Sequence, residues 1–385
     1  MSKRILTLAL VATTLLFSNC SKNDNNETPA TPPDQGGNTP ALTHANVIKN
    51  VTLEVIVATY KDMDEKAQLL KDAVYTFNNN STEENLTKVK QAWAATRQAW
   101  EQSEGFLYGP AGDKNLDPAM DSWPVDSQEI AKIIDGSSDF FQQDNNDDGV
   151  VNDEDKKITV NVITHNSNTR GFHLIEYLVW GAEGNKTAAQ ITDREKEYLL
   201  AATQDLKGNT NTLFEDWSAD KGGWANRFLK TGDQNDTKAY PSYGAAYEQY
   251  LEGMVSIADE VTSTKINNAF NPSGTPAPKE EESRFSKNST KDFADNIRSI
   301  QNVYLGQYQG RKGLGISDAV AKGNAELDGK VKTAINEAIA AIEAMGVFSD
   351  AIFNQRPKVA AAQEKVVALR DLLDNELKPY VRSLN

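Results

Sequence analysis

A histidine and a glutamate stand three positions apart, at His173 and Glu176, within a run of apolar and aromatic residues from Phe172 to Trp180. If the run is a helix, positions i and i+3 share a face, so the imidazole and the carboxylate converge on one point. A helix that is apolar all round is buried, and burying these two groups is unfavourable unless they pair or bind something. The spacing therefore predicts either a structural hydrogen bond that orients two helices, or two ligands of a divalent transition metal such as iron or zinc.

Further ligands are needed for a metal, because two donors do not complete a site and three or four are usual. The best candidates in the sequence are Glu104, Glu101 and Asp121. Arg97, Glu101 and Glu104 fall on one helix stripe at i, i+4 and i+7, flanked by tryptophans such as Trp100. The same stripe is also typical of a salt-bridged face on an exposed helix that has no function.

Hydrolytic chemistry is less well supported than binding. A metallopeptidase usually carries His-Glu-x-x-His, but no second histidine follows His173 at i+4, and His165 lies eight residues before it. No Gly-x-Ser-x-Gly elbow marks a serine nucleophile. The glycine-rich residues 306–315 lack the Gly-Lys-Ser/Thr ending of a phosphate-binding loop, which predicts a turn there.

Residues 144–155 match the spacing of a twelve-residue calcium loop. Oxygen donors fall at positions one, three, five, nine and twelve, and Gly149 stands at position six, where such a loop turns sharply. With the backbone carbonyl at position seven, the predicted ligands are Asp144, Asn146, Asp148, Val150, Asn152 and Asp155. The stretch resembles the calcium loops of dockerin modules, which also end in Asp. The alternative is an acidic surface loop that binds nothing.

Composition limits the partners of the chain. Its 385 residues suffice for two domains, and a hydrophobic content of 39% supports real cores. The net charge of −15 argues against nucleic acid and against an anionic membrane surface as partners. We therefore expect contact with a membrane only through a lipid anchor.

The N-terminal sequence predicts export and tethering. Two basic residues precede an apolar run, residues 5–17, that is too short to span a bilayer. Cys20 is the only cysteine and follows shortly after, which predicts a lipoprotein signal peptide over residues 1–20 with lipidation of Cys20, or plain secretion as the alternative. Residues 21–42 are polar and rich in proline, which predicts a disordered tether. A lipidated Cys20 would leave no thiol for disulfides or metal ligands.

The apolar residues of the remaining sequence follow helical spacing. Ser81-Thr82-Glu83-Glu84 predicts a capping box at the start of a helix, and the prolines of residues 108–129 predict an irregular segment. No stretch shows the alternation of a strand. The chain is therefore predicted to be all-α, with helices over residues 46–77, from the capping box to residue 105, and over 172–180, 192–217, 244–266, 290–304, 329–345 and 355–384.

Four sequence blocks, in this order along the chain, carry a family resemblance. They are residues 93–110, residues 116–124, the motif Gly171-x-His173-x-x-Glu176, and residues 282–290. Together they resemble the imelysin family and cover most of the chain after the tether.

The resemblance implies a fold and a place for the site. It implies two four-helix-bundle-like domains in tandem, an N-terminal one over residues 43–185 that carries the motif and a C-terminal one over residues 186–385. The long irregular segment would accompany these domains, and the calcium-type loop is predicted to be an insertion peculiar to this chain. The site would lie in the cleft between the domains, lined by Arg97, Trp100, Asp121, Trp123, Arg170, Phe285, Ser286 and Asn288.

The resemblance also implies a link to iron acquisition and a periplasmic or outer-membrane location. We therefore expect a lipoprotein of a Gram-negative cell envelope, anchored to the outer membrane and either periplasmic or surface-exposed. Its interdomain cleft would bind a metal or a small metal-bearing ligand through His173 and Glu176. Two alternatives remain: a metallopeptidase, since the family has been classed with peptidases, and a recognition module in which the pair only rigidifies the cleft.

Overall fold

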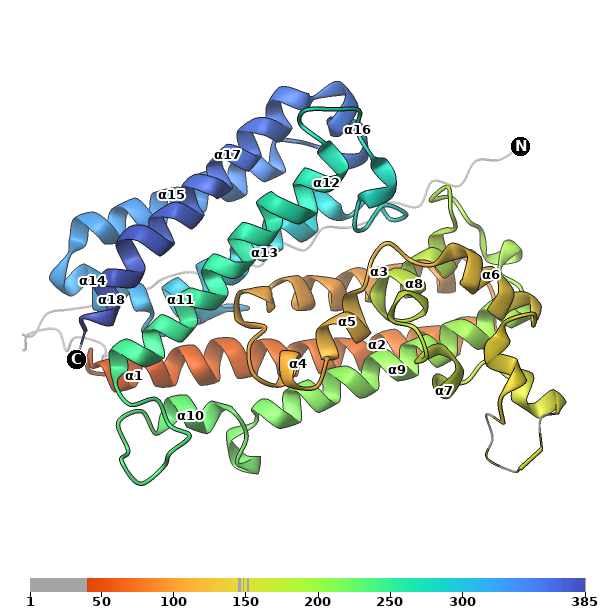
Figure 1. Ribbon diagram of the computed structural model, residues 1–385, viewed down its shortest axis with the longest axis horizontal. Coiled ribbons are helices and arrows are strands. Elements are labelled where there is room, and N and C mark those ends of the chain that lie inside the picture. The colour runs from red at the N-terminus through yellow and green to blue at the C-terminus, as the bar shows by residue number, and fades with distance from the viewer. Residues whose placement is uncertain (1–39, 145–146, 148, 151, 385) are drawn as a thin grey trace, which may run out of the picture. The chain divides into compact units, whose positions relative to one another are not determined.

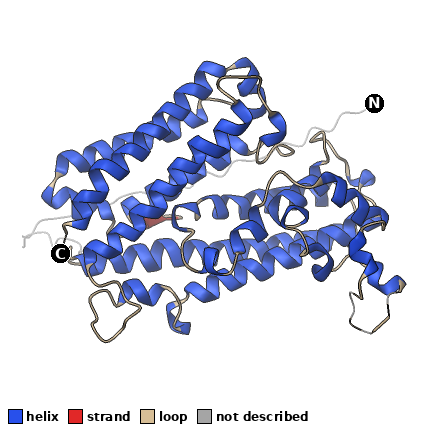
Figure 2. Ribbon diagram, viewed as in Figure 1, coloured by secondary structure: helices blue, strands red, loops and turns tan. Residues whose placement is uncertain are grey.

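Helices form nearly all the regular structure of the computed structural model, which describes residues 40–144, 147, 149–150 and 152–384 (Figures 1 and 2). The all-α prediction is confirmed. The longest helices are α2 (Ala58–Asn79), α3 (Glu83–Glu101), α9 (Asp193–Trp217), α11 (Tyr243–Glu260), α13 (Ser289–Leu305), α15 (Ala325–Glu343) and α17 (Arg356–Leu372). The motif helix is α8 (Gly171–Trp180), ten residues long.

Shorter helices connect these elements. The segment predicted to be irregular contains α4 (Pro110–Asp113) and α5 (Leu116–Asp121), separated by turns. The remaining short helices are α1 (His44–Asn50), α6 (Ser127–Asp135), α7 (Val160–Ile163), α10 (Ala225–Leu229), α12 (Asn267–Phe270), α14 (Ile316–Gly323), α16 (Phe348–Asn354) and α18 (Lys378–Arg382).

Two features of the backbone differ from the prediction. The predicted turn at residues 306–315 contains a small antiparallel hairpin, β1 (Gln307–Tyr308) paired with β2 (Arg311–Lys312). Strands of two residues are too short to show alternation in the sequence. Three predicted helices contain π-helical segments, namely η1 (Val51–Val57), η8 (Val261–Ile266) and η10 (Leu373–Leu377).

Side-chain caps fix the starts of two helices near the site. Helix α3 is capped by Thr82, whose hydroxyl accepts from the backbone N–H of Asn85 at 3.2 Å. The predicted capping box, which would begin at Ser81, is therefore not formed in full. Thr82 caps the helix alone, because Glu84 pairs with Lys88 on the exposed side of the helix. Helix α9 has a complete box, in which Thr192 and Glu195 exchange side-chain to backbone hydrogen bonds.

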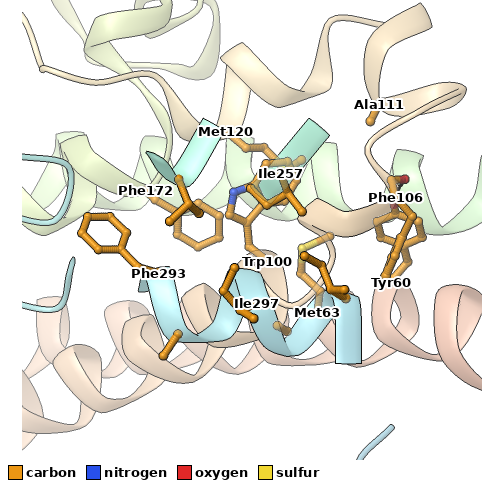
Figure 3. Close-up of a cluster of buried hydrophobic side chains, with 14 of the residues drawn as sticks. Tyr60, Met63, Trp100, Phe106, Ala111, Met120, Phe172, Ile257, Phe293 and Ile297 are labelled. Atoms are coloured by element: carbon orange, nitrogen blue, oxygen red, sulfur yellow. Dashed lines mark hydrogen bonds between the residues drawn. The ribbon is translucent and has the colours of Figure 1, made fainter. Parts of the chain in front are cut away.

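Helix packing buries one continuous core. Helix α2 packs against α3 and α9, and α13 packs against α3 and α15. Figure 3 shows Trp100 of α3, Met120 of α5, Phe172 of α8, Ile257 of α11 and Phe293 of α13 around one part of this core. Side chains from widely separated parts of the sequence therefore meet where the candidate site residues lie.

Residues Pro40–Asn385 form one compact unit. Helix α9 follows the expected boundary at residue 185 but packs against α2 and α8, which precede it. The division into two tandem domains stays a prediction. Among the described residues, no helix combines the length and apolarity needed to cross a membrane.

Two predicted features fall wholly or partly outside the described residues. The signal peptide, Cys20 and nearly all of the tether precede residue 40. In the calcium-type loop, Asn146 and Asp148 are not described. Gly149 has a φ of 83°, as a sharp turn at position six requires, and its N–H donates to Asp144 Oδ2 at 2.6 Å. Calcium binding there stays a prediction.

Candidate functional site

Nine charged or titratable side chains lie together in the core, and we call this group the buried ionic cluster. Each member is at most 5% exposed. Helices α3, α5, α8 and α13 contribute most of them, η8 contributes one lysine, and the segment before α13 contributes one glutamate. The members are Arg97, Glu101, Glu104, Asp121, His173, Glu176, Lys265, Glu282 and Asp292.

The charged stripe of α3 faces inward. Arg97 and Glu101 are fully buried and Glu104, just beyond the helix, is 5% exposed. The alternative of a solvent-exposed salt-bridged face is therefore wrong, because α13 packs on this side of α3 and closes it off from water. The flanking Trp100 is also buried, and its Nε1 donates to Asp121 Oδ2 at 2.6 Å.

Arg97 joins four carboxylates from separate elements. Its Nη1 donates to Asp121, and its Nη2 lies 2.8 Å from Glu282 Oε1 and 2.5 Å from Glu101 Oε1. Its Nε lies 3.8 Å from Asp292 Oδ2. A guanidinium offers five N–H groups in one plane, so it can hold several carboxylates in fixed relative positions.

His173 and Glu176 form the hydrogen bond that their spacing predicts. Nδ1 of His173 lies 3.1 Å from Glu176 Oε2. The other oxygen of Glu176 accepts from both the backbone N–H and the hydroxyl of Ser286, each at 2.7 Å. Both oxygens of Glu176 are therefore engaged, and this residue orients the imidazole from behind.

The opposite ring nitrogen of His173 remains available. Nε2 is buried and lies 3.1 Å from Asp121 Oδ1, but without the alignment of a hydrogen bond. The Oε2 atom of Glu282 is likewise buried with no hydrogen-bond partner among the described residues. Unpaired buried polar atoms are rare in folded proteins and call for a physical explanation.

Lys265 occupies the other side of the cluster. Its Nζ lies 2.7 Å from Glu282 Oε1, 3.1 Å from Glu104 Oε2 and 3.8 Å from Glu101 Oε2. It also lies 5.1 Å from the ring centroid of Trp123, a distance at which a cation is attracted to the aromatic face.

Carboxylates outnumber cations in the cluster. Six carboxylates face two permanent cations, Arg97 and Lys265, and one histidine. Burial raises the pKa of Glu101 and of Glu104 well above the usual range, and raises that of Asp292 to about 7. The cluster is therefore short of positive charge, and protons or another cation must supply it.

His173 and Asp121 respond in opposite directions to this environment. Burial and Arg97 act to lower the pKa of His173, but the carboxylates of Asp121 and Glu176 outweigh them and raise it to about 9. Burial acts to raise the pKa of Asp121, but Arg97 and His173 hold it well below its usual range. Asp121 thus stays ionised, and His173 carries a proton that a metal would have to displace.

The cluster contains two sets of three donor residues, and within each set the donors are close enough together to hold one ion. In each set, the donor atoms lie within 4.8 Å of one another. The first set is Asp121, His173 and Glu282, and the second is Glu101, Glu104 and Asp121. A nitrogen with carboxylate oxygens suits iron or zinc, and the first set includes both residues, His173 and Glu282, whose buried atoms lack a hydrogen bond among the described residues.

The remaining predicted residues divide into those that reach the cluster and those that do not. Asn288 donates to Asp292 Oδ1 at 2.6 Å, and the ring of Trp123 lies 6.2 Å from that of His173. Phe285 packs its ring 5.2 Å from that of Tyr177. Arg170 does not join the cluster, because its guanidinium pairs with Asp205 of α9, with Nε 2.8 Å from Oδ2.

Three members of the cluster, Glu282, Lys265 and Asp292, were not predicted as site residues from the sequence. Glu282 begins a block singled out there, but nothing local ties it to His173, which lies more than a hundred residues earlier. Lys265 had a usable signal. It continues the apolar stripe of Met254, Ala258 and Val261 at helical spacing, and a lysine on such a stripe is buried.

A cavity of about 210 Å³ borders the cluster. Glu104, Asp121 and Trp123 line it together with Asp117 and Glu260. Burial raises the pKa of Asp117 to about 6 and also raises that of Glu260. An acidic lining of this kind favours a cation over an anion.

A neighbouring cavity of about 360 Å³ extends this space. It shares Glu104, Asp117 and Glu260 with the first cavity, and it reaches the exposed side chain of Glu252. A larger groove of about 670 Å³ is lined by residues such as Phe270 and includes no member of the cluster. The smaller acidic cavities are therefore the ones relevant to this site.

The chain is similar over most of its length to one protein family and to a known relative. The family model described as Imelysin matches residues 56–375. Iron-regulated protein A of Synechococcus elongatus is 29% identical over 364 residues, which cover 90% of this chain and 89% of that protein.

Two crystal structures are similar over most of their length. A candidate iron-regulated protein A precursor from Parabacteroides distasonis has a TM-score of 0.72 and 28% identity, covering 90% of this chain and 96% of that one. An imelysin-like protein from Psychrobacter arcticum has a TM-score of 0.66 and 13% identity, covering 88% of this chain and 95% of that one, and shows likeness of fold alone.

Proposed function

Because this chain belongs to the imelysin family, we propose that it is a cell-envelope protein that binds a transition metal, or a small ligand carrying one, at the buried ionic cluster. The observation that carries the proposal is the donor set formed with Asp121: His173 Nε2 lies 3.1 Å from Asp121 Oδ1, and neither His173 Nε2 nor Glu282 Oε2 has a hydrogen-bond partner among the described residues. The name of the Synechococcus relative, an iron-regulated protein, favours iron as the metal.

The residues present fit such an ion. His173 Nε2, Asp121 and Glu282 would hold it, and Glu176 would keep the imidazole in the tautomer that leaves Nε2 free. The ion would supply the positive charge that the cluster lacks. Arg97 would hold Asp121 and Glu282 in place, because it already bonds to both.

Binding is better supported than proteolysis. The cavity beside the cluster, about 210 Å³, suits a hydrated ion and is small for a peptide chain. The carboxylates of the first donor set are held by Arg97 or Trp100, and Glu176 is held by Ser286. None of these is placed as a free general base of the kind that peptide hydrolysis needs.

The same proposal includes a location. We infer lipidation at Cys20 and attachment to the outer membrane, on the basis of the N-terminal sequence alone. Cys20→Ala is expected to move the protein from the membrane fraction to the soluble fraction of the envelope. Unchanged membrane association of that variant would contradict lipidation.

Metal content tests the binding proposal. The full chain, stripped with a chelator and dialysed against Fe(II) without oxygen, is expected to hold one iron per chain, and His173→Ala is expected to lose it because the nitrogen donor is gone. Elemental analysis counts calcium separately. His44→Ala is the matched control, since His44 also bonds a side chain, Tyr247 Oη at 3.0 Å, but lies outside the cluster. Equal iron in wild type and His173→Ala would overturn the proposal.

A further inference from the structure

Lys265 is held in an unusual position for a lysine. Its side chain has no exposure to solvent, and it projects from η8, a π-helical segment that follows α11. Single π-helical turns within helices occur frequently at functional sites, because they redirect side chains. The ammonium lies among three carboxylates that come from two different parts of the chain.

The two donor sets meet at this ammonium. They share Asp121 as a common member. Lys265 bonds Glu282, which belongs to the first set, and contacts Glu104 and Glu101, which belong to the second. The ammonium therefore lies among the oxygen atoms that a second cation would need.

Carboxylates shared between two adjacent donor sets are typical of two-metal centres, in which the ions lie about 3.5–4 Å apart. Helical carboxylate proteins build such centres from glutamates and histidines on facing helices. A positive charge already fixed in one of the two positions repels a metal there and neutralises the carboxylates that would bind it.

We propose that the ammonium of Lys265 takes the place of a second cation and so limits the buried ionic cluster to one bound metal. This inference rests on the proposed function, because it takes Asp121, His173 and Glu282 as the first metal position. Lys265 is thus a specificity-determining residue that fixes how many metal ions the protein holds.

Charge balance supports this role. The cluster has six carboxylates, and the loss of Lys265 would leave Arg97 as its one permanent cation. Uncompensated carboxylates in a buried site take up protons or cations. Glu104 keeps a connection to the cavity of about 210 Å³, which gives a cation a way to reach the vacated position.

Metal stoichiometry tests the proposal. Zn(II), which undergoes no redox reaction, is the probe, and all variants carry Asp144→Ala to disable the calcium-type loop. After equilibrium dialysis at saturating Zn(II), the parent chain is expected to hold one equivalent and Lys265→Ala two. Lys265→Met removes the charge but fills the space, so two equivalents in this variant would assign the exclusion to the charge, and one equivalent would assign it to the space that the side chain occupies.

A second substitution checks where the additional ion binds. In the Lys265→Ala chain, adding Glu104→Gln removes a donor of the second set, so the stoichiometry is expected to return to one. If Lys265→Ala is unfolded without metal, its thermal unfolding is followed during Zn(II) titration. The stabilisation is then expected to saturate at one equivalent more than in the parent chain.

The deciding quantity is the difference in bound Zn(II) equivalents per chain between Lys265→Ala and its parent. A difference of one equivalent supports the role of Lys265, and no difference overturns it. A parent chain that binds no Zn(II) or Fe(II) would instead overturn the proposed function. The two failures are therefore distinguished by the Zn(II) dialysis together with the Fe(II) dialysis described above.

Discussion

Within the signature motif, the two ionisable residues have different tasks. Glu176 uses both oxygens to hold the imidazole and the segment at Ser286, while His173 presents its other nitrogen to Asp121. The hydrogen bond between them follows from their spacing alone. What the spacing cannot supply is Glu282, because its approach depends on the packing of a segment far away in the sequence.

Glu176→Gln tests this division of tasks. An amide at this position can donate to Nδ1, which favours the tautomer that protonates Nε2 and blocks metal binding. Metal affinity is expected to fall about 10- to 100-fold, as for other residues that orient a ligand. Titration with Fe(II) without oxygen measures the change. Ser286→Ala, which removes one of two bonds to the far oxygen, is expected to have a smaller effect, and unchanged affinity in Glu176→Gln would argue against an orienting role.

The pH dependence of stability follows from His173 and Asp292. Their pKa values in the folded protein, about 9 and about 7, lie above the ordinary values of 6.5 and 3.8. A raised pKa stabilises the folded state below the unfolded value, and this stabilisation is lost as the pH rises through the folded value. For His173 alone, the loss between pH 6.5 and 9 amounts to about 3 kcal/mol.

The metal-free protein is therefore expected to melt at a lower temperature at pH 9 than at pH 6, while metal binding strengthens over the same range as His173 gives up its proton. Circular dichroism of the chelator-treated chain across this range measures the first effect. His173→Gln should flatten the part of the profile between pH 6.5 and 9. A wild-type melting temperature that does not fall over this range would contradict the assigned shifts.

At the scale of elements, the site depends on how α8 begins. Gly171, the first residue of α8, has a φ of 77°, and a Cβ there would lie 2.2 Å from the backbone oxygen of Met120. The absence of a side chain allows the start of α8 to lie against the end of α5. This contact places Asp121, the residue after Met120, beside His173.

Gly171→Ala is expected to lower both the melting temperature and the metal affinity. The left-handed conformation alone costs a non-glycine residue about 1–2 kcal/mol, and the new methyl group must also push α5 away. Thermal unfolding and Fe(II) titration measure the two effects. Gly208→Ala is the control, since its Cβ would meet nothing within 4 Å inside α9 and should be neutral or stabilising. Equal behaviour of the two variants would contradict a docking role for Gly171.

The elements themselves were largely predictable from the sequence. Apolar spacing located α9 and α13 to within one residue at each end, because each helix buries one face along its whole length. The π-helical segment η8 was not predictable, since one extra residue per turn hardly alters the pattern of apolar positions. The inward direction of Lys265 was predictable from the apolar stripe that it continues, but its carboxylate partners were not, because they come from distant segments.

At the scale of the whole molecule, the cluster exists only when the chain is folded. Its members come from residues 97 to 292, and the two central cations, Arg97 and Lys265, are each bonded to carboxylates from more than one segment. Breaking such a buried pair by removing one partner is strongly destabilising. The cluster therefore links the motif helix, the segment before α13 and η8 into one arrangement.

The depth of the cluster affects how fast a bound ion could leave it. An ion held by Asp121, His173 and Glu282 would be shielded from bulk water on most sides, because none of these residues is more than 4% exposed, and the acidic cavity beside Asp121 would be its route outward. Its departure would lead past the carboxylates of Glu104, Asp117 and Glu260, which attract a cation, so release is expected to be slower than ligand exchange in solution. Under the proposed function, such a site would therefore exchange its ion slowly.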